Sequence, residues 1–211
     1  MTRLLVATRN RGKQAEFRTL LASLPFGIVF PADIDLAESA AEAQLEPFDS
    51  FEANARSKAR WFAARSHLAT LADDSGLEVD ALRGAPGVQS RRFAGLDGAD
   101  ERVTEANNAL LLRRLVDVPD ALRTARYRCV LVIASAPGER DGLPEITVAG
   151  VTEGRILRAP RGSHGFGYDP IFFSDELGRT FGEAKPAEKH AISHRARAVA
   201  ALAAVLQGRP V

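Results

Sequence analysis

Apolar and polar positions in the first third of the chain predict alternating strands and helices. The run Arg3–Thr8 is rich in Leu and Val and predicts a buried strand. Asn10–Ser23 carries apolar residues at helical spacing and predicts a helix, and Gly27–Phe30 predicts a second strand. Phe48–His67 contains no Gly or Pro and has apolar residues at helical spacing. It predicts the longest helix of this region, so the order is that of βα units.

The middle of the chain predicts shorter elements separated by a turn and a loop. Thr70–Asp73 and Leu77–Val79 predict two short strand pieces on either side of a turn at Ala72–Gly76, which reads ADDSG. Residues 84–98 are rich in Gly and Pro and predict a loop. Ala99–Leu115 predicts the next helix.

The last third predicts a β-hairpin and a closing helix. Tyr127–Ser135 predicts a strand, Pro137–Gly142 a turn, and Glu145–Val151 the hairpin partner. The apolar Ile171–Phe173 begins another strand, and the Ala-rich Pro186–Leu206 predicts one closing helix with Pro in its first turn. Because βα units are followed by a hairpin, we expect an α/β fold with a mixed sheet flanked by helices.

Composition limits the class of protein. A length of 211 residues predicts one domain over 1–211, or one domain with two lobes. No apolar run reaches the roughly 18 residues of a membrane span, and the apolar run at the N-terminus is too short for a signal peptide. The single cysteine, Cys129, lies in an apolar run and fits a reducing compartment. The net charge of +1 gives no support for nucleic-acid binding. These features together lead us to expect a cytoplasmic protein that binds neither membrane nor nucleic acid.

The basic residues are strongly biased. Of the 28 Lys and Arg residues only four are Lys: Lys13, Lys58, Lys185 and Lys189. A lysine ammonium acts on a phosphate as a compact point charge, whereas guanidinium offers a planar fork. Three of the four lie in segments that carry other candidate chemistry, which directs attention to phosphate binding.

The segment Ala7–Lys13, ATRNRGK, predicts a strand, a loop and a helix start with a lysine. Backbone N–H groups at a helix N-terminus, together with that lysine, suit phosphate, and Thr8 and Asn10 add polar side chains. It is not a P-loop, because no Gly stands five residues before Gly12 and Gln14 replaces the magnesium-binding hydroxyl. An ordinary Asn cap before a surface lysine is the alternative.

Two adjacent acids end an apolar strand in ADDSG. Side chains alternate along a strand, so only one of Asp73 and Asp74 should face a given site. A carboxylate there is a ligand that Mg²⁺ prefers, and it is also able to accept a proton from an attacking water. Taken alone, the segment fits equally an Asp-Ser-Gly turn.

Two helical segments add donors. Asn54 and Lys58 are four residues apart and share a helix face, which alone would be typical of a solvated face. His190 and His194 are also four apart, but no third ligand completes a zinc motif. Donors for base edges and phosphates are the better interpretation of this second segment.

Arg161–Phe173, RGSHGFGYDPIFF, combines three glycines with rings and hydrogen-bonding groups ahead of an apolar strand. Glycines let a backbone approach a ligand closely. The segment therefore predicts a loop that grips a flat polar ligand such as a nucleobase, with a plain Gly-rich turn as the alternative.

These segments together resemble the inosine/xanthosine triphosphate pyrophosphatases, cytosolic enzymes that hydrolyse non-standard purine nucleoside triphosphates (ITP, dITP and XTP) to monophosphate and pyrophosphate. The resemblance runs from residue 4 to about residue 206. The matching segments are LLVATRNRGKQAE, FEANARSKA, ADDSGLEVDAL, GAPGVQSRRFAG, RCVLVIA, GSHGFGYDPIFF and AEKHAISHRARA.

The resemblance implies a long mixed twisted sheet flanked by helices, with two lobes around a deep active-site cleft, and a homodimer. It implies Mg²⁺ as cofactor, with Mn²⁺ as a substitute. Asp74 would be the catalytic proton acceptor and a metal ligand. Glu46 would be the second metal carboxylate, in a stretch where Leu45-Glu46-Pro47-Phe48 stands in place of the family's Glu-Glu-Thr-Gly.

The resemblance also implies a set of substrate contacts. For the triphosphate these are Thr8, Arg9, Asn10, Arg11, Gly12, Lys13 and Lys58; for base and sugar, Phe166, Gly167, Tyr168 and Asp169; Ser75 contacts substrate, and Lys189, His194 and Arg195 complete the base and phosphate contacts. Donors from His194 and Arg195 would fit the O6 acceptor of inosine and xanthosine, where adenine carries an amine.

Two alternatives remain at this stage. One is a related pyrophosphatase that prefers modified pyrimidine nucleotides, against which the ISHR and HGFGYD segments argue. The other is a non-catalytic nucleotide-sensing or RNA-binding module, which would not need Asp74 beside a phosphate-binding helix and would show a basic surface studded with aromatics.

Overall fold

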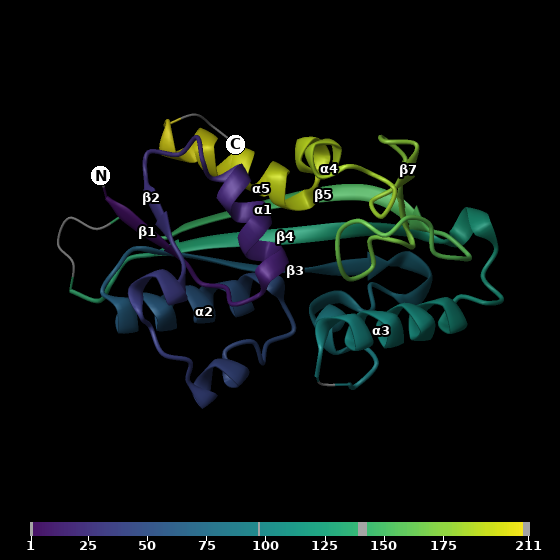
Figure 1. Cartoon of the computed structure of the whole chain (residues 1–211), viewed down its shortest axis with the longest axis horizontal. Coiled ribbons are helices and arrows are strands. Elements are labelled where there is room, and N and C mark those ends of the chain that lie inside the picture. The colour runs from purple at the N-terminus through teal and green to yellow at the C-terminus, as the bar shows by residue number, and fades with distance from the viewer. Residues whose placement is uncertain (1, 97, 139–142, 209–211) are drawn as a thin grey trace. The chain divides into compact units, whose positions relative to one another are not determined.

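A computed structural model describes residues 2–96, 98–138 and 143–208. Within these residues, seven strands form one mixed sheet in the order β2-β1-β3-β4-β5-β6-β7 (Figure 1). Strand β1 runs parallel to β2 and β3, whereas β6 is antiparallel to β5 and β7. The strands are β1 Arg3–Val6, β2 Gly27–Val29, β3 Thr70–Val79, β4 Thr124–Ala134, β5 Ile146–Ile156, β6 Phe172–Ser174 and β7 Arg179–Thr180.

Helices flank this sheet, which confirms the predicted α/β class. The α-helices are α1 Arg11–Leu20, α2 Phe51–Ser66, α3 Asp100–Arg114, α4 Pro186–Ile192 and α5 His194–Leu206. Short 3₁₀ helices are η1 Pro31–Ile34, η2 Ala40–Gln44, η3 Asp80–Leu82, η4 Gly87–Arg92 and η5 Asp120–Leu122. Within the described residues, no helix is long and apolar enough to cross a membrane.

The chain is organised in two compact units. Unit 1 comprises Met1–Asp74, Cys129–Gly150 and Arg195–Val211, and unit 2 comprises Ser75–Arg128 and Val151–His194. The long strands β3, β4 and β5 contribute residues to both. Each unit has a hydrophobic core of its own.

In unit 1, α1 and α5 pack on one side of the sheet and α2 lies on the other (Figure 1). Helix α1 begins where the Asn10 side chain accepts a hydrogen bond from the Lys13 N–H at 2.9 Å, which satisfies one of the first-turn donors. Phe17 and Leu21 are four residues apart and fully buried against α5. Cys129 lies in the same core, and burial raises the pKa of its thiol.

Unit 2 is built around aromatic rings. Tyr127, Phe172 and Phe181 pack together, with ring centroids 4.7–5.8 Å apart. Arg123, almost fully buried, donates to the carbonyl oxygens of Leu115 and Ile156 at 2.6 and 2.8 Å. A buried guanidinium thereby closes the C-terminal end of α3, whose last carbonyls lack helical partners.

Two predicted elements were wrong. The ADDSG segment is not a turn, because β3 continues through it from Thr70 to Val79. Both acids find partners inside the fold, so the strand is not interrupted by their demand for water. The closing helix is split, because Ser193 adopts an extended conformation (φ −64°, ψ 155°) between α4 and α5.

Some other elements have different boundaries from those predicted. The predicted loop 84–98 contains η4, and the strand predicted at Glu145–Val151 extends to Ile156 as β5. Strands β4 and β5 are neighbours in the sheet, as the hairpin prediction requires. Of the turn predicted at Pro137–Gly142, residues 139–142 lie outside the described residues.

Candidate functional site

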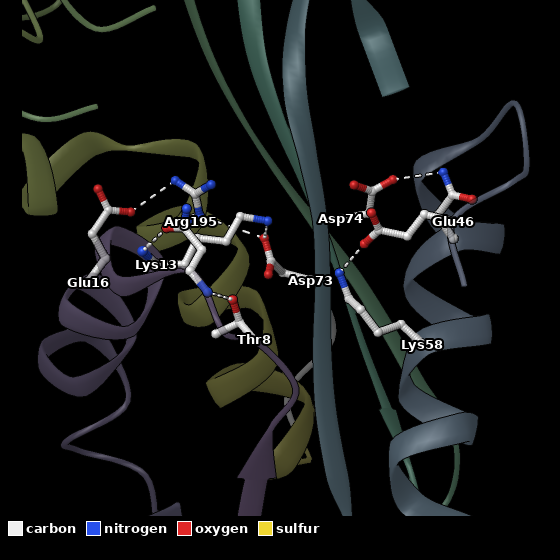
Figure 2. A network of polar contacts seen from close by, with 10 residues as sticks. Thr8, Lys13, Glu16, Glu46, Lys58, Asp73, Asp74 and Arg195 are labelled. Atoms are coloured by element: carbon white, nitrogen blue, oxygen red, sulfur yellow. Dashed lines mark hydrogen bonds and ion pairs between the residues drawn. The ribbon is translucent and has the colours of Figure 1, made fainter. Parts of the chain in front are cut away.

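Consecutive acids of β3 anchor a polar network in unit 1. Asp73 and Asp74 point to opposite sides of the strand, as alternation predicts (Figure 2). Each meets a separate set of side chains from the flanking helices. We call the following residues the β3 cluster: Lys13, Glu16, Glu46, Asn54, Lys58, Asp73, Asp74 and Arg195.

Asp73 compensates two cations on the side of α1 and α5. Its carboxylate is 1% exposed and lies 2.8 Å from Lys13 Nζ and 3.8 Å from Arg195 Nε. Burial alone would raise the pKa of Asp73, but Lys13, Lys58 and Arg195 hold it well below its usual range. Arg195 also donates to Glu16 Oε2 at 2.9 Å (Figure 2). Two acids therefore balance two cations in this buried half of the cluster.

Asp74 lies in the other half, facing α2. It accepts a hydrogen bond from Asn54 Nδ2 at 3.0 Å. Glu46 forms an ion pair with Lys58 on the same side of β3 (Figure 2). Burial disfavours the charged form of Asp74, and the Glu46 carboxylate adds repulsion that Lys58 and Lys13 only partly offset, so its pKa rises to about 6. An acid with that pKa is able to accept and release a proton near neutral pH.

The pKa values of Glu46 and Lys58 both move in the direction that favours the charged form of each group. Burial would raise the pKa of Glu46, but Lys58 and Lys13 keep it lowered. Burial would lower the pKa of Lys58, but the carboxylates of Glu46, Asp73 and Asp74 raise it. Two nearby carboxyl groups with pKa values pushed apart are typical of sites where one acid handles protons and the other stays ionised.

Asn54 fixes the position of Asp74 relative to the segment that carries Glu46. Its side chain is 1% exposed. Its amide oxygen accepts from the Phe48 N–H at 2.9 Å, and its amide nitrogen donates to the Phe48 carbonyl at 3.1 Å and to Asp74. Both amide protons are used, so the orientation of the side chain is determined. The sequence placed Asn54 on the Lys58 face of the helix but gave it no role.

The donor set suits a hard divalent cation better than zinc. Among the described residues, no group of three or more His, Cys, Asp or Glu side chains is arranged to hold a metal. Asp74 and Glu46 instead offer two carboxylates on one side of β3 (Figure 2). Mg²⁺ is commonly held by one or two carboxylates plus substrate phosphates, whereas zinc takes three or four protein ligands. The residues therefore fit Mg²⁺ bound together with a phosphorylated substrate.

The start of α1 is arranged as a helix N-terminus beside this cluster. The Asn10 side chain is spent on capping, and Thr8 Oγ1 accepts the Asn10 N–H at 3.3 Å. Arg9 grips Glu42 through two hydrogen bonds of 2.7 and 2.8 Å, and this pairing raises its pKa. Arg11 is exposed in the first turn. Because the side chains of Arg9 and Asn10 already have partners, the backbone N–H groups of that turn are the donors better suited to an anion.

A second cluster lies in unit 2. We call Tyr127, Phe166, Asp169, Lys189 and His194 the aromatic cluster. Asp169 is 2% exposed and accepts from Lys189 Nζ at 2.6 Å, the Phe166 N–H at 2.8 Å and the Tyr127 hydroxyl at 3.2 Å. Lys189 Nζ lies 4.8 Å from the centroid of the Phe166 ring. One carboxylate thus ties the glycine-rich loop to a lysine and to β4.

The loop glycines are required by these contacts. Gly165 has φ +76°, and a Cβ there would lie 2.0 Å from Asp169 Oδ2. Gly167 also has positive φ, and its carbonyl accepts from Asn108 Nδ2 at 3.1 Å. Tyr168 is buried and donates its hydroxyl to the Ser90 carbonyl at 2.8 Å. Tyr168 therefore packs inside the fold, and Phe166 is the half-buried ring of this loop.

The structure groups the residues that the sequence singled out. Unit 1 contains Thr8 to Lys13, Glu46, Lys58, Asp74 and Arg195. Unit 2 contains Ser75, Phe166 to Asp169, Lys189 and His194. Sequence reasoning missed Glu16, Asn108 and Tyr127 and gave Asp73 no place in a site. The position of Glu16 next to the apolar Phe17 is a sequence signal that this acid faces the interior. The sequence gives no comparable signal for Asn108 or Tyr127.

An open mixed sheet flanked by helices, with two adjacent carboxylates on β3 and lysines from α1 and α2 beside them, defines an α/β protein with a cluster of paired charges on its central sheet. The chain belongs to the Ham1 family, whose sequence profile matches residues 4–205. It is 46% identical over 204 residues to a protein named dITP/XTP pyrophosphatase from Exiguobacterium sibiricum, covering 97% of this chain and 96% of that one. A protein of the same name from Geobacter sulfurreducens is 46% identical over 203 residues, 96% and 95% of the two chains.

Solved structures agree with this assignment. The HAM1 protein from Coxiella burnetii is 36% identical with a TM-score of 0.82, covering 99% of this chain and 100% of that one. The nucleoside-triphosphatase or dITP/XTP pyrophosphatase from Mycobacterium abscessus is 43% identical with a TM-score of 0.71, covering 95% and 98%.

Proposed function

We propose that this protein hydrolyses non-standard purine nucleoside triphosphates, such as ITP, dITP and XTP, to the monophosphate and pyrophosphate, and so removes them from the nucleotide pool. The observation that carries the proposal is Asp74, a buried acid with a pKa of about 6 beside Lys58 and Glu46. The names of the relatives support the substrate class.

In the proposed reaction a water oxygen attacks the α-phosphorus, and the bond from that phosphorus to the α,β-bridging oxygen breaks. Asp74 accepts the proton of the water, and pyrophosphate leaves with the bonding electron pair. Lys13 and Lys58 offset the negative charge that grows on the leaving group, together with the N-terminus of α1. Asn54 holds Asp74 in one orientation throughout.

We propose that Asp74 and Glu46 hold Mg²⁺, with Mn²⁺ as a substitute. The ion would supply charge neutralisation on the phosphates. Before it binds, the Glu46 carboxylate is kept ionised by Lys58, because the lysine lowers the pKa of Glu46. Lys58 thereby keeps an acceptor-only ligand ready at neutral pH.

We propose that the aromatic cluster holds the base. Phe166 offers a stacking face. In proteins that bind single-stranded nucleic acid, base–aromatic stacking contributes about 1–3 kcal/mol per base. His194 and Arg195 offer donors for the O6 acceptor of inosine and xanthosine. The amine of adenine at this position would offer those donors no acceptor, and a site built on hydrogen bonds rejects such a mismatch.

Glu46→Gln is expected to raise the Mg²⁺ concentration needed for half-maximal pyrophosphate release by about tenfold, because a neutral amide replaces a charged ligand. A Mg²⁺ titration at saturating ITP measures this. Glu52→Gln is the matched control, since Glu52 is about half exposed and pairs with Arg56. An unchanged titration for Glu46→Gln would move the metal role to another acid.

Lys13→Ala is expected to lower kcat/KM for ITP and ATP by the same factor, because phosphate contacts do not sense the base. Arg195→Ala should lower the ratio of kcat/KM for ITP to kcat/KM for ATP by about 10- to 100-fold, which corresponds to the loss of one charge-assisted contact. Removing Arg195 leaves Glu16 buried and lowers stability, but the ratio is measured on one preparation and is independent of the folded fraction. A Lys13→Ala variant with a changed ITP-to-ATP ratio of kcat/KM, together with an Arg195→Ala variant that keeps the wild-type ratio, would contradict the assignment of Lys13 to the phosphates and Arg195 to the base.

A substrate panel separates the candidate functions. ITP, dITP and XTP should be hydrolysed much faster than ATP, GTP or modified pyrimidine triphosphates. Preference for a modified pyrimidine would favour the related pyrophosphatase activity, and binding without turnover would favour a nucleotide-sensing module. We also propose a cytoplasmic homodimer, which light scattering after size exclusion and cell fractionation would test.

A further inference from the structure

Tyr127 of β4 contacts two separate parts of the aromatic cluster. Its hydroxyl donates to Asp169 Oδ1 at 3.2 Å, and its ring is stacked on His194 with a centroid distance of 4.7 Å and an angle of 11°. We propose that Tyr127 is a positioning residue for base recognition, which fixes the glycine-rich loop and the His194 ring at the same time. The inference rests on the proposed function, because it concerns how the base site is held.

The Tyr127 hydroxyl gives the second oxygen of the buried Asp169 carboxylate a hydrogen-bond donor. Lys189 and the Phe166 N–H both donate to Oδ2 of Asp169, whereas the Tyr127 hydroxyl donates to Oδ1. A carboxylate with a donor on each oxygen has one rotamer that satisfies all of them. Since the Phe166 N–H depends on that rotamer, the hydroxyl of Tyr127 acts on the position of the proposed stacking ring.

The ring of Tyr127 fixes His194 by packing. It is nearly parallel to the rings of both His194 and Phe181, at 11° and 4°. His194 is the first residue of α5 and follows the extended Ser193, so helical backbone on its N-terminal side does not hold it. A flat partner on β4 limits the rotation of the imidazole and therefore the direction of its donors.

The loop needs such an anchor because its backbone is permissive. Gly162, Gly165 and Gly167 all have positive φ. Glycine loses more conformational entropy on ordering than other residues, so the loop is held by its tertiary contacts. Tyr127 supplies a contact from a central strand of the sheet, and Asp169 transmits it to the loop.

Tyr127→Phe and Tyr127→Leu separate the two contacts. Tyr127→Phe removes the hydroxyl and keeps the stack, and it is expected to raise KM for ITP about three- to tenfold with kcat within about twofold of wild type. The dissociation constant of inosine monophosphate, measured by calorimetry, should rise by the same factor. Tyr127→Leu also removes the stack, and it should raise both constants further and narrow the ITP-to-ATP ratio of kcat/KM.

Leu115→Ala is the control for core stability. Leu115 is fully buried in the same hydrophobic core, so this variant should lower Tm while KM and the monophosphate affinity stay at the wild-type values. The inference is overturned if Tyr127→Phe keeps the wild-type KM and affinity, or if Leu115→Ala changes them as much. A wild-type protein that neither hydrolyses ITP nor binds inosine monophosphate would instead refute the proposed function, and the inference with it.

Discussion

Asp74→Asn is expected to lower kcat for ITP by about 10²–10⁴-fold, the range that general base catalysis contributes. The amide is nearly isosteric and still able to contact Asn54, so the fold should persist. It cannot accept a proton from water, because the acid with a pKa of about 6 has been removed. The measurement is the steady-state rate of pyrophosphate release, with calorimetric binding of a non-hydrolysable ITP analogue to show that the substrate still binds.

Asp73→Asn is the matched control on the neighbouring residue. Asp73 faces Lys13 and Arg195 on the other side of β3, so kcat should fall much less than in Asp74→Asn (Figure 2). The variant should lose stability instead, because two buried cations lose a carboxylate partner. An active Asp74→Asn together with an inactive, well-folded Asp73→Asn would reverse the assignment of the base.

Asp169→Ala is expected to lower the free energy of unfolding by about 3–5 kcal/mol, the cost of breaking a buried ion pair by removing one partner. Lys189 is 4% exposed and lies 2.6 Å from Asp169 Oδ2, so its ammonium would be left buried without that carboxylate. The Phe166 N–H and the Tyr127 hydroxyl would lose their acceptor too. Urea denaturation followed by circular dichroism measures the loss.

The double variant Asp169→Ala/Lys189→Met is the control for that result. It removes the uncompensated charge and should recover a large part of the lost stability, because a buried pair replaced by apolar groups is often close to neutral. A single variant as stable as wild type, or a double variant no more stable than the single one, would show that the pair does not anchor the loop.

Local pattern predicted most of the fold. Apolar runs and helical spacing located β1, α1, β2 and α2, because burial of one face determines those elements. Alternation along a strand correctly separated Asp73 from Asp74. The resemblance to a family supplied the rest of the candidate site, and the family is confirmed.

Long-range pairing could not be predicted from local pattern. Arg195 and Glu16 are 179 residues apart in the sequence, and Tyr127 and Asp169 are 42 apart. The turn expected at ADDSG failed for the same reason, since turn residues were outweighed by sheet pairing and buried partners for both acids. The break at Ser193 interrupts an Ala-rich helical pattern that gives no local warning of it.

The central claim is that this protein cleaves non-standard purine triphosphates between the α- and β-phosphates with the help of Mg²⁺. Product analysis of ITP incubated with the wild-type protein tests it directly. Equal amounts of inosine monophosphate and pyrophosphate, formed with Mg²⁺ and abolished by excess EDTA, are the predicted result. Release of inorganic phosphate with inosine diphosphate, full activity in EDTA, or equal rates with ATP would contradict it.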